Sequence, residues 1–289
     1  MATLGCRDEH WKLRYSSCRG VFEAGVEWQS MRFARILIVA TAATAVLPAQ
    51  WINYPNPATP RTADGKPNLA APPPRKDGKP DLSGIWRITR PRTIPAGEGS
   101  YASLQYWMAN GETISMQPWA EALFKQRYAS FGAGRPSERC LPHAIPDAMI
   151  VGNFKIVQDP GLFLILYEEF ARFRQIFTDG RDFPQEMSPA WFGYSVGRWD
   201  GDVLVVDSQG FNDLNWLDDA GHPHTDAMRT IERFRRRDFG HMEIQLTVDD
   251  PKAYTKPWTF TMQFQIMPDT ELIEDVCENE KDAPHTVVQ

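Results

Sequence analysis

Two histidines and an aspartate occupy every second position of the stretch His222-Pro223-His224-Thr225-Asp226. If this stretch is extended, its three polar side chains fall on one side, with about 7 Å between successive ones. Imidazoles at that spacing can share a divalent metal ion, with Asp226 as a third ligand. Alternatively, Asp226 orients His224 as a general acid or base. A polar surface turn stiffened by Pro223 is the third interpretation.

Glu232 is a second candidate for proton chemistry. It lies in the strand-like stretch Met228–Arg236 and shares a face with Phe234. If that face lines the inside of the protein, burial raises the carboxyl pKa unless a cation meets it. An arginine such as Arg181 or Arg198 could supply that cation in a purely structural pair.

The segment Gly193–Gly197 has the G-x-S-x-G pattern of a serine-hydrolase nucleophile, with Ser195 at its centre. That mechanism needs the serine on a sharp turn from a strand into a helix. Here the pattern runs into Asp200-Gly201, which is typical of a hairpin turn, so a serine hydrolase is a further alternative only. The two glycines leave one face of the strand nearly bare, and a bare face admits either a neighbouring chain or a ligand.

Aromatic side chains gather in the sequence around this bare strand, at Trp191, Tyr194 and Trp216. Together with Ser195 and Arg181 they predict a pocket for a small hydrophobic or aromatic molecule, because such pockets combine aromatic walls with a few polar groups. An ordinary aromatic core is the alternative.

The elements that must position these groups are strands, because apolar residues alternate with polar ones. In Met242–Asp249, for example, Met242, Ile244, Leu246 and Val248 fall on one side, which indicates a strand with one buried face. The predicted strands are Ser83–Ile88, Phe154–Gln158, Leu162–Glu169, Phe173–Thr178, Phe192–Trp199, Val203–Ser208, Met228–Arg237, Met242–Asp249, Trp258–Met267 and Leu272–Cys277.

The connections between these strands favour antiparallel pairing. Asp179-Gly180 and Asp200-Gly201 supply the positive φ that tight hairpin turns need. One helix is predicted, over Gln117–Ala129, and none separates the later strands as parallel crossovers require. We therefore expect an all-β fold, an antiparallel barrel of about ten strands with one short helix. A sandwich is the alternative, but a barrel also removes exposed strand edges.

The N-terminal part predicts export. Residues 31–49 read as a signal peptide, because two arginines precede the apolar run Ile36–Ala49, which is shorter than the roughly 20 residues of a membrane span. Residues 1–30 then form an extension upstream of the true start, or alternatively an anchor helix. We expect residues 50–82, rich in proline, to be an extended arm and residues 83–289 to be the barrel domain, with no membrane span after signal cleavage.

Net charge and cysteine content indicate which partners are excluded and in which compartment the protein works. The formal net charge is −6, and an acidic protein repels phosphate backbones, so we expect no nucleic-acid partner. Cys140 and Cys277 follow the predicted signal, and an oxidising compartment permits a disulfide between them. Two buried free thiols are the alternative. We expect the protein to be secreted or periplasmic.

Two resemblances carry further expectations. Gly84-Ile85-Trp86 is similar to the G-x-W that opens lipocalins, whose tryptophan closes one end of a calycin-type barrel. The phrases Thr178–Arg181, Gly193–Asp202, Pro223–Asp226 and Glu232–Phe234 resemble a large uncharacterised family of secreted bacterial proteins. That resemblance implies export and supplies no mechanism.

The leading functional hypothesis is an enzyme without cofactor that performs acid–base chemistry on a hydrophobic or aromatic small molecule, as a lyase, isomerase or hydrolase. His224 would be the acid or base, Asp226 would orient it and Glu232 would be the complementary carboxylate. The alternative is a lipocalin-like carrier without chemistry. A metal-dependent protein that uses His222, His224 and Asp226 is a further alternative.

Overall fold

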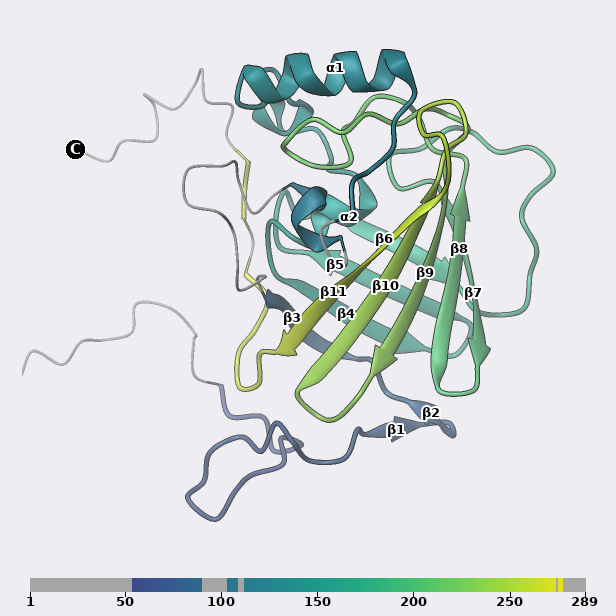
Figure 1. Cartoon of the computed structure of the whole chain (residues 1–289). Helices are drawn as coiled ribbons and strands as arrows, with labels where there is room; N and C mark the ends of the chain where they lie inside the picture. The colour runs from purple at the N-terminus through teal and green to yellow at the C-terminus, as the bar shows by residue number, and fades with distance from the viewer. Residues whose placement is uncertain (1–53, 90–102, 109–111, 274, 278–289) are drawn as a thin grey trace, which may run out of the picture. The chain divides into compact units, whose positions relative to one another are not determined.

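Buried and more exposed residues alternate along the strands, as the sequence predicts. The computed structural model describes residues 54–89, 103–108, 112–273 and 275–277. Within these ranges, nine strands close into a barrel in the order β10-β11-β3-β4-β5-β6-β7-β8-β9 (Figure 1). They are β3 (Gly84–Thr89), β4 (Phe154–Asp159), β5 (Leu162–Tyr167), β6 (Phe173–Phe177), β7 (Tyr194–Asp200), β8 (Val203–Gln209), β9 (Arg229–Arg236), β10 (His241–Asp249) and β11 (Trp258–Ile266). The prediction of an all-β barrel is confirmed.

The prediction that all strands are antiparallel is wrong at one position. β6 and β7 are parallel, and their register covers only the pairs Ile176 with Ser195 and Phe177 with Val196. A closed ring with an odd number of strands needs at least one parallel pair, because each antiparallel pair reverses the chain direction. Among its described residues, Leu272–Cys277 does not supply the expected tenth strand, since Asp275 forms only an isolated bridge with Glu169.

The turn at Asp179-Gly180 explains where the parallel pair arises. Gly180 has a φ of 87°, which suits a tight turn, but no strand follows immediately. Pro184 and Pro189 lie in the next stretch, and proline cannot donate to a strand ladder. The chain therefore runs on to Tyr194 before β7 begins. By contrast, Asp200-Gly201 joins β7 and β8 as a hairpin, as predicted.

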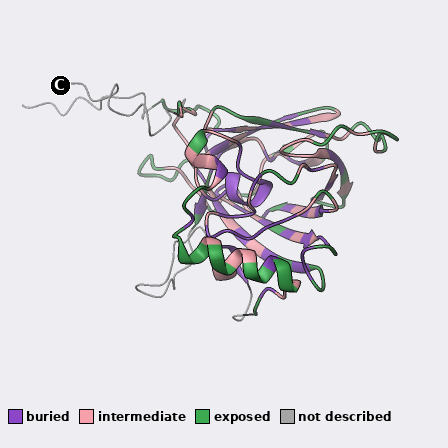
Figure 2. Ribbon diagram, turned by 90° about the horizontal axis from the view of Figure 1, so that it is seen from above, coloured by how far each residue is buried: buried purple, intermediate pink, exposed green. Residues whose placement is uncertain are grey.

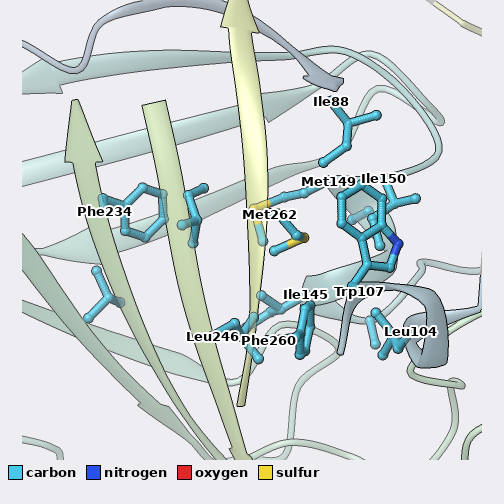
Figure 3. Packing of buried hydrophobic residues seen from close by; sticks show 14 of the residues in the cluster. Ile88, Leu104, Trp107, Ile145, Met149, Ile150, Phe234, Leu246, Phe260 and Met262 are labelled. Carbon is cyan, nitrogen blue, oxygen red and sulfur yellow. The ribbon is translucent and has the colours of Figure 1, made fainter. Parts of the chain in front are cut away.

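One end of the barrel is closed by short helices. The predicted helix is present as α1 (Pro118–Ala129), which is mostly exposed and has Ala120 as its buried residue (Figure 2). α2 (Ile145–Ala148) lies below it in Figure 1, and the chain also forms the 3-10 helices η1 (Leu104–Trp107) and η3 (Pro136–Arg139). Buried side chains of η1 and α2 pack onto the inner faces of β10 and β11 around Leu246, Phe260 and Met262 (Figure 3).

The other end is covered by the Pro-rich arm, which belongs to the same compact unit as the barrel. The arm contains a two-stranded hairpin, β1 (Arg75–Lys76) and β2 (Lys79–Pro80). Arg75 binds both carboxylate oxygens of Asp202, at 3.0 and 2.9 Å. Trp86 is fully buried nearby, and the guanidinium of Arg236 lies 5.0 Å from its ring.

Within the part of the chain that the structure describes, no helix is long and apolar enough to cross a membrane. The predicted extension (residues 1–30) and signal peptide (residues 31–49) lie outside the described residues.

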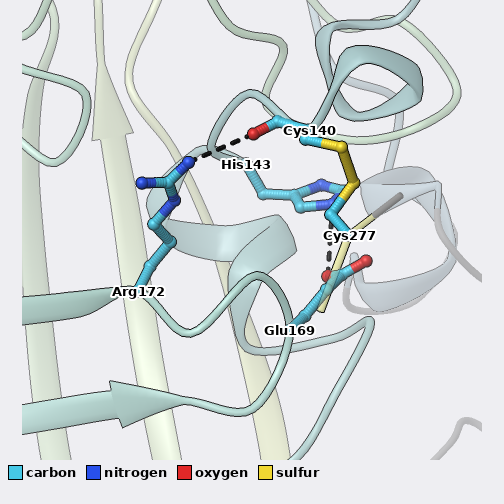
Figure 4. Close-up of a disulfide and its surroundings, with 5 residues drawn as sticks. All are labelled: Cys140, His143, Glu169, Arg172 and Cys277. Atoms are coloured by element: carbon cyan, nitrogen blue, oxygen red, sulfur yellow. Dashed lines mark hydrogen bonds and ion pairs between the residues drawn. A yellow bond between two sulfur atoms is a disulfide. The ribbon is translucent and has the colours of Figure 1, made fainter. Parts of the chain in front are cut away.

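The predicted disulfide is present in the structure. Cys140 and Cys277 are bonded across a sequence separation of 137 residues, and their Cα atoms lie 5.5 Å apart. The bridge ties the end of η3 to the segment that follows the last strand (Figure 4).

Replacing both cysteines by serine should lower the free energy of unfolding by about 2–5 kcal/mol, because the crosslink restricts the unfolded chain over a long loop. Urea denaturation of the double variant and of the wild type, each with and without reductant, measures this. Reductant should destabilise the wild type alone, and an unchanged midpoint would contradict the expectation.

Candidate functional site

A buried ion pair crosses the interior of the barrel. Arg174 of β6 and Glu232 of β9 are 2% and 0% exposed. The guanidinium binds the carboxylate through two parallel hydrogen bonds, Nη1 to Oε1 at 3.0 Å and Nη2 to Oε2 at 2.5 Å. Burial lowers the pKa of Arg174, but the charge and hydrogen bonds of Glu232 raise it more, so the guanidinium stays charged. Glu232 thus has an arginine partner, and it is Arg174 rather than the Arg181 or Arg198 considered from sequence.

Two serines complete this pair. Ser195 Oγ accepts hydrogen bonds at 3.1 Å from both Nε and Nη2 of Arg174, and Ser208 Oγ accepts one from Nη2 at 2.9 Å. Ser208 also donates to Ser195. The nearly bare face of β7 therefore admits a neighbouring side chain: the small Ser195 makes room for the guanidinium. Ser195 lies within a strand, is 1% exposed and is bound by Arg174, so the structural context of a serine-hydrolase nucleophile is not met.

The two arginines considered from sequence lie elsewhere, Arg181 in the loop between β6 and β7 and Arg198 on β7. Arg181 is paired with Asp179, and its guanidinium lies 4.0 Å from the ring of Phe177. Arg198 pairs with Asp182 at 2.7 Å. Both are substantially exposed.

An aromatic groove of about 430 Å³ opens where β6 and β7 diverge beyond their two register pairs. Its walls include three of the predicted ligand-binding residues, Trp191, Tyr194 and Ser195. Trp216 does not join them, because it packs against Arg127, whose guanidinium lies 4.1 Å from its ring. The remaining lining residues are Pro142, Ala171, Arg172, Phe173, Arg174, Gln175, Phe177, Ala190, Phe192 and Gly193.

The predicted catalytic group of His224, Asp226 and Glu232 does not come together through direct contacts. Asp226 is at the surface, where its carboxylate binds Lys252 at 2.7 Å. His224 is buried, with Nε2 2.5 Å from Asn215 Oδ1 and Nδ1 3.2 Å from the carbonyl of Thr225. Asp226 therefore does not orient His224. Burial lowers the pKa of His224 more than the Thr225 carbonyl and nearby acidic groups raise it.

The metal set predicted from His222, His224 and Asp226 does not form either. His222 is 1% exposed, and its Nδ1 lies 2.6 Å from Asp218 Oδ2. Its ring stacks on Phe124 with 4.1 Å between centroids. This segment is an irregular loop instead of the expected strand, and its three side chains face different partners.

The structure reveals a cluster that the sequence analysis missed. His143 lies between two carboxylates, and its Nδ1 is 2.5 Å from Asp147 Oδ2. Its Nε2 is 3.2 Å from Glu169 Oε2 (Figure 4). Burial lowers the pKa of His143, but Asp147 and Glu169 outweigh it and raise the pKa to about 11. Burial raises the pKa of Asp147 to about 7, against the opposite influence of His143. In the sequence, the separation of four positions between His143 and Asp147 is the feature that could have indicated their contact, because it places two side chains on one face of a helical turn.

Comparison with models of known protein families and with curated proteins gave no match. The similarity to a family of secreted bacterial proteins accordingly stays a prediction.

Replacing Arg174 by methionine should destabilise the protein by about 3–5 kcal/mol, because it leaves the charge of Glu232 buried without a partner. The double variant Arg174→Met with Glu232→Leu should recover much of that loss. Arg233→Met is the matched control, since Arg233 pairs with Asp200 at the exposed surface, where an ion pair contributes about 0–1 kcal/mol. Urea denaturation measures all of these, and equal effects at positions 174 and 233 would contradict the role of burial.

Stability should fall as the pH drops below 6.5, because the unfolded chain protonates His224 while the folded protein, with its lowered pKa, does not. This histidine's contribution is complete above pH 6.5 and is lost as the pH approaches its folded pKa. Between pH 7 and 5, the wild type should lose more unfolding free energy than His224→Gln, by at most about 1.4 kcal/mol per pH unit. Urea midpoints at both pH values test this, and parallel losses would refute it.

Proposed function

We propose that this chain is an exported protein that binds a small hydrophobic or aromatic molecule with an anionic group in the groove between β6 and β7. The observation that carries the proposal is the combination of aromatic walls with an arginine that has no carboxylate partner among the described residues. Arg172 lines the groove, and its contact in the described structure is a hydrogen bond from Nη2 to the Cys140 carbonyl at 3.2 Å.

The groove has the character of a ligand site. Its volume of about 430 Å³ falls in the range of small-molecule pockets, which are mostly apolar with a few polar groups that set orientation. Phe173 is 60% exposed at its rim, and an apolar ligand would remove that surface from water. The guanidinium of Arg172 suits a carboxylate, because its planar donors match two oxygens at once.

The barrel interior, where a lipocalin-like carrier would hold its ligand, is occupied by side chains. Trp86, Phe154, Phe234 and Phe264 are almost fully buried there, beside the ion pair of Arg174 and Glu232. The groove is therefore the better binding place. Export is supported by the signal-like residues 31–49 and by the disulfide, because disulfides persist in oxidising compartments.

Acid–base chemistry has less support than binding. Glu232 holds Arg174, Asp226 holds Lys252, and the ring nitrogens of His224 face Asn215 and Thr225. A direct acid–base pair needs its groups within hydrogen-bond reach of one substrate. The non-catalytic alternative from the sequence analysis is accordingly the function that we carry forward.

Binding of 2-naphthoate, and of its neutral analogue 2-naphthalenemethanol, tests the proposal by isothermal titration calorimetry. Phe173→Ala should weaken binding of both probes at least tenfold, because it removes a wall of the groove. Arg172→Gln should weaken the carboxylate selectively. Phe131→Ala and Arg198→Gln are the matched controls, since Phe131 is 95% exposed and Arg198 pairs with Asp182 away from the groove lining.

Equal affinity of the two groove variants and their controls would place the binding elsewhere. Failure of the wild type to bind either probe in the millimolar range would remove the aromatic-anion specificity that the groove suggests.

A further inference from the structure

His143, Asp147 and Asp219 form a compact group of side chains at the capped end of the barrel. Among the residues that the structure describes, they are the one set of three histidine, cysteine or acidic side chains with potential ligand atoms in mutual reach, all within 4.8 Å of one another. Asp147 belongs to α2, while His143 and Asp219 come from loops that are separate in sequence.

The buried carboxylate of Asp147 is incompletely satisfied. This residue is 1% exposed, yet its Oδ1 has no hydrogen-bond partner among the described atoms. A buried acceptor without a partner costs about 1–3 kcal/mol, and more when it is charged. An oxygen atom in this state can donate an electron pair to a metal ion.

The charges around the group also favour a cation. Asp147, Asp219 and Glu169 supply three carboxylates, and the arginine that pairs with them in the described structure is Arg135, whose Nε lies 3.5 Å from Asp219 Oδ1. A divalent ion would balance the three negative charges together with Arg135.

We propose that His143, Asp147 and Asp219 bind one divalent transition-metal ion, Zn²⁺ or Mn²⁺. One imidazole nitrogen with two carboxylates suits these ions. His143 binds through Nδ1, on the side of Asp147, while its Nε2 faces Glu169 Oε2 at 3.2 Å. This is the usual arrangement of a metal-binding histidine, whose second nitrogen is held by a carboxylate.

The potential ligand atoms lie within 4.8 Å of one another, so the side chains must shift to form the site. In a tetrahedral site with metal–ligand distances near 2.1 Å, neighbouring ligand atoms lie about 3.4 Å apart. The contact between His143 Nδ1 and Asp147 Oδ2 must therefore open by roughly 1 Å from its present 2.5 Å. Three protein ligands leave a fourth position for water. This inference is independent of ligand binding in the β6–β7 groove.

Metal analysis of tag-free full-length protein, purified without chelators, tests the proposal, followed by titration of the chelator-treated protein with Zn²⁺, Mn²⁺, Mg²⁺ and Ca²⁺. The wild type should bind one equivalent of Zn²⁺ or Mn²⁺, and the ion should raise its melting temperature. Asp219→Asn and His143→Gln should each bind at least tenfold more weakly.

His241→Gln is the matched control, because His241 also pairs with an aspartate, Asp238 at 2.8 Å, but outside the cluster. It should bind metal as the wild type does. Asp219 is partly exposed, so its asparagine variant keeps the test valid if His143→Gln does not fold. Lack of saturable Zn²⁺ or Mn²⁺ binding by the wild type would overturn the proposal, and so would equal affinity in all variants or preference for Mg²⁺ or Ca²⁺.

Discussion

The ion pair between Arg174 and Glu232 compensates for the weakest joint of the barrel. β6 and β7 share only two register pairs, so backbone hydrogen bonds hold the ring closed there less firmly than elsewhere. From inside, Arg174 of β6 contacts Ser195 on β7, Ser208 on β8 and Glu232 on β9. Such a pair is tolerated in a dry interior only when its hydrogen bonds are satisfied, and here the two serines satisfy them. The buried polar side chains thus connect the strands at the place where backbone pairing is shortest.

The sequence was sufficient for the strands but not for how they close. Alternation over Met242–Asp249 and Trp258–Ile266 identified strands with one buried face, because period-2 patterns are local. The parallel joint depends on how the loop between the consecutive strands β6 and β7 returns the chain to the sheet, and no local pattern encodes that. Asp179-Gly180 shows the difference. The predicted turn forms there, yet the prolines that follow it prevent a hairpin.

The same distinction applies to the candidate sites. Tyr194 and Trp191 were found because aromatic residues cluster in the sequence, and both line the groove. Arg172, just before β6, and Phe173, its first residue, complete the groove from another part of the chain, which spacing alone could not show. His143 was not among the residues singled out from the sequence. Its partners Glu169 and Asp219 lie far from it in sequence, so only the folded chain brings them together.

The parallel joint also bears on the order in which the barrel assembles. β7 to β11 follow one another as antiparallel neighbours, and so do β3 to β6, so each arc is a run of sequential partners. Closing the ring then requires two joints, β11 with β3 and β6 with β7, of which the second has the fewest hydrogen-bonded pairs. We expect the β6–β7 strand pair to form last during folding and to separate first in native-state fluctuations. Its amide protons would then exchange with solvent sooner than those of β9 and β10, which pair along eight residues.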